Sequence, residues 1–404
     1  MRKRTDSRVL IGLTEISGYA CNFRAGFVEF GVRADLLDLQ PAGFRFSDDV
    51  PPTRLMRLLQ RVSRARLTAV RGTARRRAFP TVQCTLLPLA LLQALGRYDT
   101  FVFLYDTSFL RQRELPLLKL FRKRVIHVFC GSDDRPTYLD GGQMAREAHA
   151  SLDACIASVR AKKRMIRRVE RYADVVITNP SHGLLHERPF VSFPAVGIPR
   201  VVPAEPSLER AIGRLKIVHA APHPVAKGTA SICAILDRLR ENSYEFDYEV
   251  VQGASNVELR KHLQTCDFGV DQVWGDNTPM DGLVADAALF GKPAVVGGYG
   301  WDELERGSPG GTLPPSERCH PDELERAIVR LLTDADHRRE LGERARRFIV
   351  ERWQASMVAG RPLDLLDGAA GAPVGAGSLV TRDVPKDVLV IGQPGRVVEQ
   401  SVEA

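Results

Sequence analysis

A strand, a loop and the start of a helix follow one another in residues 216–236, KIVHAAPHPVAKGTASICAIL. The β-branched run at 216–220 predicts the strand, and apolar residues recur with helical spacing between Ile232 and Leu239. Lys227 therefore stands where a strand passes into a helix. Because a helix start presents unpaired N–H groups and about half a positive charge, this position suits either a bound phosphate or a merely solvated lysine.

Two more units of the same kind follow. One strand is expected at 248–251 with a helix near 257–263, and another strand is expected at 267–274. A small, apolar helical segment at 283–290 comes next and contains one carboxylate, Asp286. A carboxylate in such a helix costs desolvation unless it is paired, so Asp286 either makes structural hydrogen bonds or binds a polyol.

These segments resemble the donor half of the retaining nucleotide-sugar glycosyltransferases of the GT-B architecture (group 1 type). The resemblance rests on Lys227-Gly228-Thr229 and on the run DAALFGKP at 286–293. It implies an α/β fold in which two Rossmann-like domains face each other across a cleft. It also implies that Lys227 holds the donor diphosphate and that Asp286 binds the ribose hydroxyls.

Two positions depart from the family pattern. Thr278 stands where the family has an acid that contacts the transferred sugar, and Pro222 stands where it often has an arginine. The nearby substitutes are Asp276, Asn277 and Asp281 for the acid and His223 for the cation.

The resemblance and the expected loops together give a set of candidate site residues. The catalytic candidates are Asp133 and Asp281. The donor-binding candidates are Lys227, Gly228, Thr229, Gly253, Gly282, Asp286, Gly297 and Gly298, the last two in an expected loop at 297–300. No metal-binding pattern is visible and no cofactor is expected. A lysine and two helix starts can stabilise the leaving diphosphate in place of a metal ion.

The first half of the chain opens as strand, helix and strand at 8–14, 22–30 and 34–39, which is typical of a parallel sheet with ligands at the carboxyl ends of its strands. Gly18 and Tyr19 follow the first strand and are acceptor-side candidates. Tyr19 is either an acceptor contact or a packing residue.

Another expected strand, at 125–129, runs into Cys130-Gly131-Ser132-Asp133. This loop resembles the Gly-Ser-Asp segment on the acceptor side of the family's cleft, so Ser132 is a third acceptor-side candidate. Asp133 either orients an acceptor hydroxyl or caps a turn.

Nine arginines and no acidic residue lie between Pro51 and Pro80. On a helix, six of them form one stripe, at Arg54, Arg57, Arg61, Arg64, Arg71 and Arg75. Basic amphipathic helices lie on anionic membranes, where each arginine near the surface contributes about 1 kcal/mol. The alternative is a solvated helix face that covers the domain core.

The length of 404 residues exceeds the roughly 250–300 at which a single core stops growing, so two domains are expected. A net charge of +8 favours anionic partners. Nucleic acid is not an expected partner, because aromatic residues are only 7% of the chain and are not interleaved with the arginines. Seven scattered cysteines suit a reducing cytoplasm. No apolar run is long enough to span a bilayer.

Four parts of the chain are expected. They are an acceptor domain at 1–198, a donor domain at 199–344, a helix at 345–368 that crosses back to the first domain, and a tail at 369–404. A proline-rich stretch at 193–206 marks the hinge. The tail resembles the end of hexapeptide-repeat acyltransferases, but it is too short to form a solenoid alone.

The predicted function is transfer of a sugar from a nucleotide sugar to an acceptor, with retention of the sugar's anomeric configuration. The acceptor is expected to be a lipid-linked or cell-surface glycan precursor. The predicted location is the cytoplasm, with peripheral attachment to the inner membrane face. Two alternatives stay open. One is a catalytically silent scaffold of the same fold, favoured by Thr278 and Pro222, and the other is a nucleotide-sugar epimerase or a phosphorylase.

Overall fold

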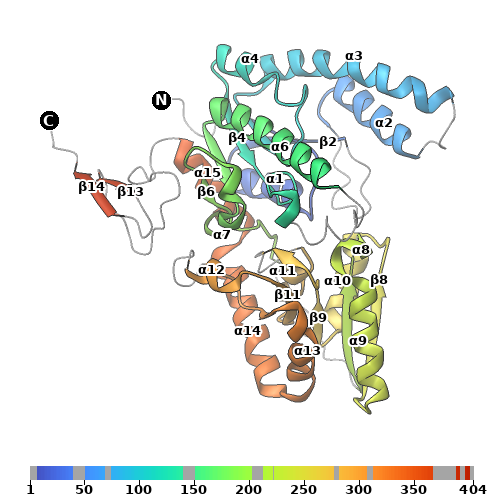
Figure 1. The fold of residues 1–404 in the computed structure, drawn as a ribbon. Helices are drawn as coiled ribbons and strands as arrows, with labels where there is room; N and C mark the ends of the chain where they lie inside the picture. The colour runs from blue at the N-terminus through green and yellow to red at the C-terminus, as the bar shows by residue number, and fades with distance from the viewer. Residues whose placement is uncertain are drawn as a thin grey trace.

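The computed structural model describes residues 7–39, 51–68, 74–139, 151–202, 213–221, 223–276, 282–306, 313–366, 388–391 and 396–400. Most of them form two domains, each a parallel β-sheet with helices around it, and the two domains lie one above the other in Figure 1. The predicted α/β fold of two Rossmann-like domains is confirmed.

The first sheet has the strand order β2-β1-β3-β4-β5-β6, and all neighbouring strands are parallel. Its strands are β1 (Arg8–Leu13), β2 (Arg33–Asp38), β3 (Thr100–Leu104), β4 (Arg124–Val128), β5 (Val175–Thr178) and β6 (Val191–Ser192). Its helices are α1 (Tyr19–Glu29), α2 (Arg54–Thr68), α3 (Ala74–Arg97), α4 (Leu115–Leu120), η2 (Thr137–Leu139), α6 (Leu152–Tyr172), η3 (Pro180–Leu185) and α7 (Phe193–Val196). Every residue of β3 is buried, as expected when helices cover both faces of a parallel sheet.

The second sheet has the order β10-β11-β9-β7-β8, with β12 also paired to β11, and it too is parallel. Its strands are β7 (Leu215–Ala220), β8 (Phe246–Val251), β9 (Phe268–Val270), β10 (Gly275–Asp276), β11 (Ala294–Tyr299) and β12 (Glu317–Cys319). Its helices are α8 (Pro224–Lys227), α9 (Thr229–Glu241), α10 (Asn256–Thr265), α11 (Gly282–Leu289), α12 (Trp301–Arg306), η4 (Pro321–Glu323), α13 (Leu324–Thr333) and α14 (Ala335–Arg352).

The chain passes between the domains at two adjacent places. The backbone N–H of Arg200 donates to the carbonyl of Trp353 across 2.8 Å, and the N–H of Ala355 donates to the carbonyl of Arg200 across 3.0 Å. Two helices occupy the segment predicted as one crossing helix. The first, α14, packs on α11, and the second, α15 (Ala355–Leu366), packs on α1 of the first domain.

The close fit between α1 and α15 depends on Gly26. A Cβ at this position would lie 2.0 Å from the carbonyl oxygen of Ala355 and 2.9 Å from the Cβ of Ala359. One of the buried apolar clusters contains residues of both domains, among them Phe23 of α1, Trp353 and Leu283 of α11. The two domains therefore share part of their core.

The tail contains an antiparallel pair of strands, β13 (Val388–Ile391) and β14 (Arg396–Gln400). Its resemblance to the end of a hexapeptide-repeat protein stays a prediction. Among the described residues, no helix combines the length and the apolar character that crossing a membrane requires.

Candidate functional site

Each sheet has a strand from which the connections leave in opposite directions. These strands are β1, between β2 and β3, and β7, between β8 and β9. In open α/β sheets such a switch point forms a crevice at the carboxyl ends of the strands, where ligands bind. The loop after β1 reaches the second domain, because a Cβ added to Gly282 at the start of α11 would lie 3.0 Å from the Cβ of Ser17. The carboxyl edges of the two sheets therefore meet.

Lys227 lies at the switch point of the second sheet. Its Nζ is 3.2 Å from both carboxylate oxygens of Asp271 and 2.9 Å from Oε1 of Gln272, two residues that directly follow β9. The Asp271 side chain is 1% exposed, whereas that of Lys227 is 15% exposed. The buried carboxylate fixes the ammonium group at the carboxyl edge, where it can still meet an anion.

Gly228 and Thr229 form the link from Lys227 to α9. Gly228 has φ +74°, and a Cβ there would lie 2.6 Å from Cγ2 of Val273, so a glycine is required. The hydroxyl of Thr229 is buried and lies 2.8 Å from Nε2 of His219, whose Nδ1 lies 2.8 Å from the carbonyl oxygen of Val270. Burial lowers the pKa of His219, so the neutral ring can donate to the carbonyl and accept from Thr229. Thr229 thus anchors the start of α9.

Asp286 is 2% exposed and has several partners. Its carboxylate accepts hydrogen bonds from Nδ2 of Asn256 at 2.8 Å and from a terminal nitrogen of Arg260 at 3.0 Å. Nε of Arg200 lies 3.6 Å away. The carboxylate thus joins α10 and α11 to Arg200, and its contact with ribose stays a prediction.

The predicted donor-side glycines occupy different environments. Gly253 follows β8 with φ +68° and has no neighbour that a Cβ would meet within 4 Å. Gly297 and Gly298 lie within β11 and not in a loop, and a Cβ on Gly297 would lie 2.6 Å from the carbonyl oxygen of Val273. Gly297 therefore allows close packing. Asp281 lies outside the described residues.

The acceptor-side candidates follow β1 and β4, at the carboxyl edge of the first sheet. Gly18 has φ +77° and precedes α1. Tyr19 is 3% exposed and its ring stacks on those of Phe23 and Phe193, each with centroids 5.5 Å apart, so Tyr19 is a packing residue here. The hydroxyl of Ser132 lies 2.9 Å from that of Tyr105, which follows β3.

Asp133 holds the loop in which it lies. Its carboxylate accepts backbone hydrogen bonds from Cys130 at 3.0 Å and from Gly131 at 2.8 Å. Burial, together with the charge of Asp134, raises the pKa of Asp133 well above its ordinary value. The geometry is that of the turn cap, one of the two roles considered for this residue.

A buried network next to Asp133 did not emerge from the sequence. The carboxylate of Asp134 lies 3.2 Å from Nδ1 of His182 and 3.4 Å from Nε2 of His186. It also accepts a hydrogen bond from Thr178, and Nδ1 of His186 lies 3.0 Å from Glu170. No sequence spacing signals this network, because its members come from α6, from the end of β5, from η3 and from the loops around them.

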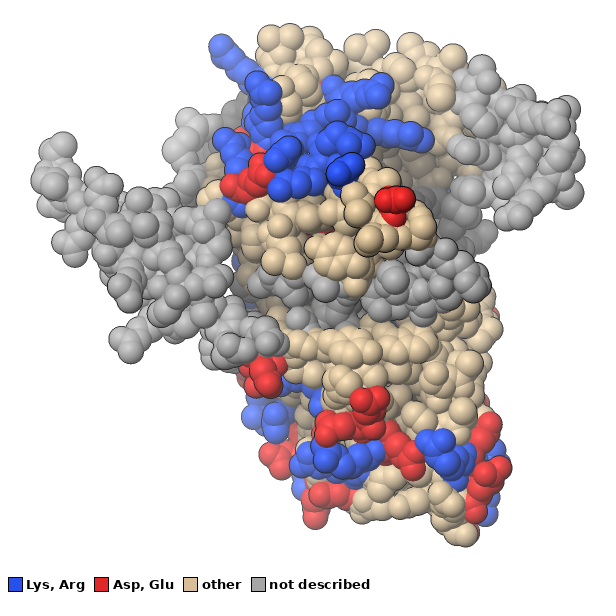
Figure 2. All heavy atoms as spheres, viewed as in Figure 1, with Lys and Arg blue, Asp and Glu red and all other residues tan. Residues whose placement is uncertain are grey.

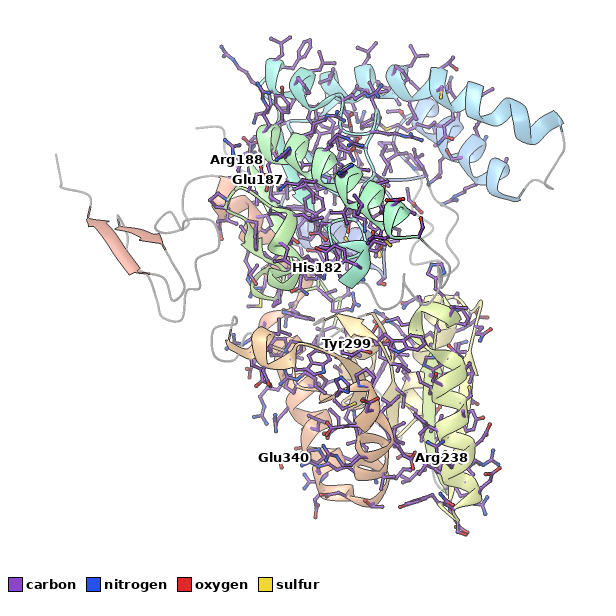
Figure 3. All side chains as sticks on the ribbon, viewed as in Figure 1. His182, Glu187, Arg188, Arg238, Tyr299 and Glu340 are labelled. Carbon is purple, nitrogen blue, oxygen red and sulfur yellow. The ribbon has the colours of Figure 1, made fainter. Side chains whose placement is uncertain are left out.

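The network extends toward the second domain, because η3, which contains His182, packs on α12. Nε2 of His182 lies 3.4 Å from a terminal nitrogen of Arg135. In Figure 3, His182 lies at the edge of the first domain, opposite Tyr299 at the end of β11.

The sequence places Glu15, which directly follows the first strand, on the side of the cleft, but it predicts no role for this residue. Its carboxylate accepts backbone hydrogen bonds from Ala20 at 3.2 Å and from Cys21 at 2.8 Å, at the start of α1. Burial raises the pKa of Glu15 to about 7. Across the described ranges, no group of three or more His, Cys, Asp or Glu residues is arranged to hold a metal ion.

No protein-family model matches the sequence. A search of curated proteins gives no match either.

Several solved structures share the fold. Sucrose-phosphate synthase from Thermosynechococcus elongatus is 13% identical with a TM-score of 0.55, over 90% of this chain and 99% of that one. Alr3699/HepE from Anabaena, in complex with UDP and glucose, is 11% identical with a TM-score of 0.52, over 89% and 99% of the two chains. TarM is 8% identical with a TM-score of 0.52, over 90% and 99%. The chain therefore has the GT-B fold of these proteins, with two Rossmann-like domains whose carboxyl edges meet.

Proposed function

We propose that this protein is a glycosyltransferase that takes its sugar from a UDP-sugar. The position of Lys227 carries the proposal, because a buried carboxylate holds its ammonium group at the switch point of the second sheet. The HepE structure, which has the same fold, contains UDP and glucose. Acceptor candidates are a glycan or a lipid-linked glycan precursor, bound by the first domain.

In the proposed reaction the bond from the sugar to the diphosphate breaks while a bond to the acceptor oxygen forms. Negative charge therefore grows on the diphosphate. Lys227, together with the helix starts at Gly228 and Gly282, would stabilise that charge without a metal ion. Loss of the lysine contact should weaken donor binding by about 1.5–3 kcal/mol, which is roughly 10- to 100-fold.

The proposal includes retention of the sugar's configuration, which rests on the resemblance around Lys227 and Asp286. We assign contact with the transferred sugar to Asp281. Asp133 would act on the acceptor through the loop that it caps. Proton NMR of the product's anomeric position, compared with the donor, tests retention.

The proposal also places the protein at an anionic membrane through α2. The side chains of Arg54, Arg61 and Arg64 are exposed and that of Arg57 is half-buried. The opposite face is buried and packs on α3, so α2 covers the core and also presents a basic face to solvent.

The test is thermal stabilisation by UDP, GDP, TDP and ADP, each compared with the protein alone. We expect UDP to raise the melting temperature, since a ligand that binds only the folded state stabilises it. Lys227→Ala should strongly reduce the shift. Activity would then be sought by following the consumption of UDP-sugars.

Lys216→Ala is the matched control. Lys216 is also a half-buried lysine paired with a carboxylate, Glu249 at 3.0 Å, but it lies in β7 far from that strand's carboxyl end. This variant should keep the full UDP shift. If no nucleotide shifts the melting temperature, or if Lys227→Ala keeps the shift, the transferase proposal fails.

A second candidate function is a catalytically silent scaffold of the same fold. The partners of Asp286 favour it, because Arg200, Arg260 and Asn256 surround the carboxylate that the family uses for ribose. A scaffold need not bind nucleotide, so the same melting experiment separates the two functions.

A further inference from the structure

The outer face of α6 carries a stripe of exposed side chains that is apolar at the start of the helix and basic toward its end. Residues three or four positions apart lie on one side of a helix. Leu152, which is 76% exposed, and Ile156, 38% exposed, begin the stripe. Exposed arginines continue it to the end of the helix, at Arg160, Arg164, Arg167, Arg168 and Arg171.

Negative charge near this stripe comes from the exposed Asp153, in the first turn of α6, and from Glu187. Glu187 pairs with Lys163 at 3.0 Å and with Arg167 at 2.8 Å. Glu170 lies on the same helix, but it is buried and points toward His186. Figure 2 shows Lys and Arg side chains gathered over the part of the first domain where α6 and α4 lie.

An exposed apolar tip lies beside the basic end of α6. Leu120 and Phe121, at the end of α4, are 76% and 54% exposed. The preceding residue, Lys119, places its Nζ 2.5 Å from Oδ1 of Asp174, which lies two residues after the end of α6. Arg122 and Lys123 follow Phe121 directly.

We propose that this surface, made by the α6 stripe and the tip at Leu120 and Phe121, docks on an anionic phospholipid membrane. We call it the α4–α6 surface. Its arginines would bind phosphate headgroups, for which the guanidinium group is well suited. Leu120 and Phe121 would enter the boundary between headgroups and acyl chains, where apolar and aromatic side chains gain free energy.

The mixture of charge and apolar exposure favours a membrane over other anionic partners. A nucleic acid would contact the arginines, but its phosphates offer no apolar environment for Leu120. The α4–α6 surface shares no residue with α2 or with the nucleotide site, so this proposal depends on neither.

The test uses the full chain and vesicles of phosphatidylcholine with or without phosphatidylglycerol. We expect the protein to sediment with the anionic vesicles and less with the neutral ones. Arg164→Gln combined with Arg168→Gln should weaken binding about 25-fold, at about fivefold for each charge removed. Leu120→Ser combined with Phe121→Ser should weaken binding by about tenfold or more.

Two pairs of substitutions serve as controls. Arg344→Gln with Arg347→Gln removes two exposed arginines from α14 in the second domain and should leave binding unchanged. Arg54→Gln with Arg61→Gln removes two exposed arginines from α2, so this variant measures how much of the vesicle binding comes from α2 and not from the α4–α6 surface. Circular dichroism and melting temperature confirm folding, and the UDP shift of each variant shows whether the nucleotide site is intact.

Three results would overturn the proposal. One is equal binding of the parent protein and the Arg164/Arg168 variant. Another is an equal loss of vesicle binding in the α14 control, which would show that binding depends on the protein's overall positive charge and not on this surface. The third is weaker vesicle binding by the Arg164/Arg168 variant with unchanged vesicle binding by the Leu120/Phe121 variant. The apolar tip would then take no part in binding, and an acidic protein or a nucleic acid would suit this surface better than a membrane.

Discussion

At the scale of single residues, Lys227 and Asp271 depend on each other. Asp271 is almost completely buried, so removal of the lysine takes a cation away from a buried carboxylate. We expect Lys227→Ala to lower the free energy of unfolding by about 1–3 kcal/mol. The loss should be partly recovered when Asp271→Asn is added. Urea unfolding of the two single variants and the double variant gives this coupling energy.

Lys216 provides the comparison for this prediction. Its pair with Glu249 is more exposed, with side chains 22% and 40% accessible, so Lys216→Ala should cost less than about 1 kcal/mol. Equal costs for Lys216→Ala and Lys227→Ala would show that burial of Asp271 is not what holds Lys227.

At the scale of elements, His186 joins α6 to the loop after β4. Burial lowers the pKa of His186, but hydrogen bonds with the carboxylates of Asp134 and Glu170 outweigh it, so the pKa is raised above its ordinary value. The protonated ring therefore stabilises the folded state. This contribution is complete below about pH 6.5, the ordinary pKa of histidine, and is lost as the pH rises through the raised pKa.

We expect stability to fall as the pH rises above about 6.5 and His186→Gln to flatten this dependence. Urea unfolding at a series of pH values measures it. His320 offers a control, because it is exposed and its carboxylate partner is the exposed Asp322. A parent protein and a His186→Gln variant with the same pH profile would contradict the role of the network.

Local patterns predicted the elements better than they predicted the contacts of the site. The helical spacing that starts near Ile232 predicted α9, and its existence is confirmed at Thr229–Glu241. The partners of Asp286 could not be predicted, because Arg200 comes from the place where the chain crosses between the domains and Arg260 comes from a different helix. Likewise Gly297 looked like a loop residue, but β11 continues through it because its neighbours β10 and β12 hold it in the sheet.

At the scale of the whole molecule, one arginine connects both domains. Arg200 is 1% exposed and lies at the place where the chain crosses. Its guanidinium group donates to the carbonyl of Ser17 in the first domain at 3.3 Å and to that of Gly282 in the second at 3.5 Å. Its Nε faces Asp286. Arg200 therefore contributes to the relative position of the two domains, together with the shared core and the α1–α15 contact.

Two substitutions distinguish the role of Arg200 in linking the domains from its role in pairing with Asp286. Arg200→Ala and Arg260→Ala each remove one cation from this carboxylate, so each should lower the free energy of unfolding by about 1–3 kcal/mol. Only Arg200 also contacts the carbonyls of Ser17 and Gly282, so only Arg200→Ala should let the domains move apart. Small-angle X-ray scattering should then show a larger radius of gyration for Arg200→Ala and the parent value for Arg260→Ala. Both variants could instead lose stability and keep the parent radius of gyration. In that case Arg200 stabilises the protein only through its pair with Asp286. The shared core and the α1–α15 contact would then hold the domains together without Arg200.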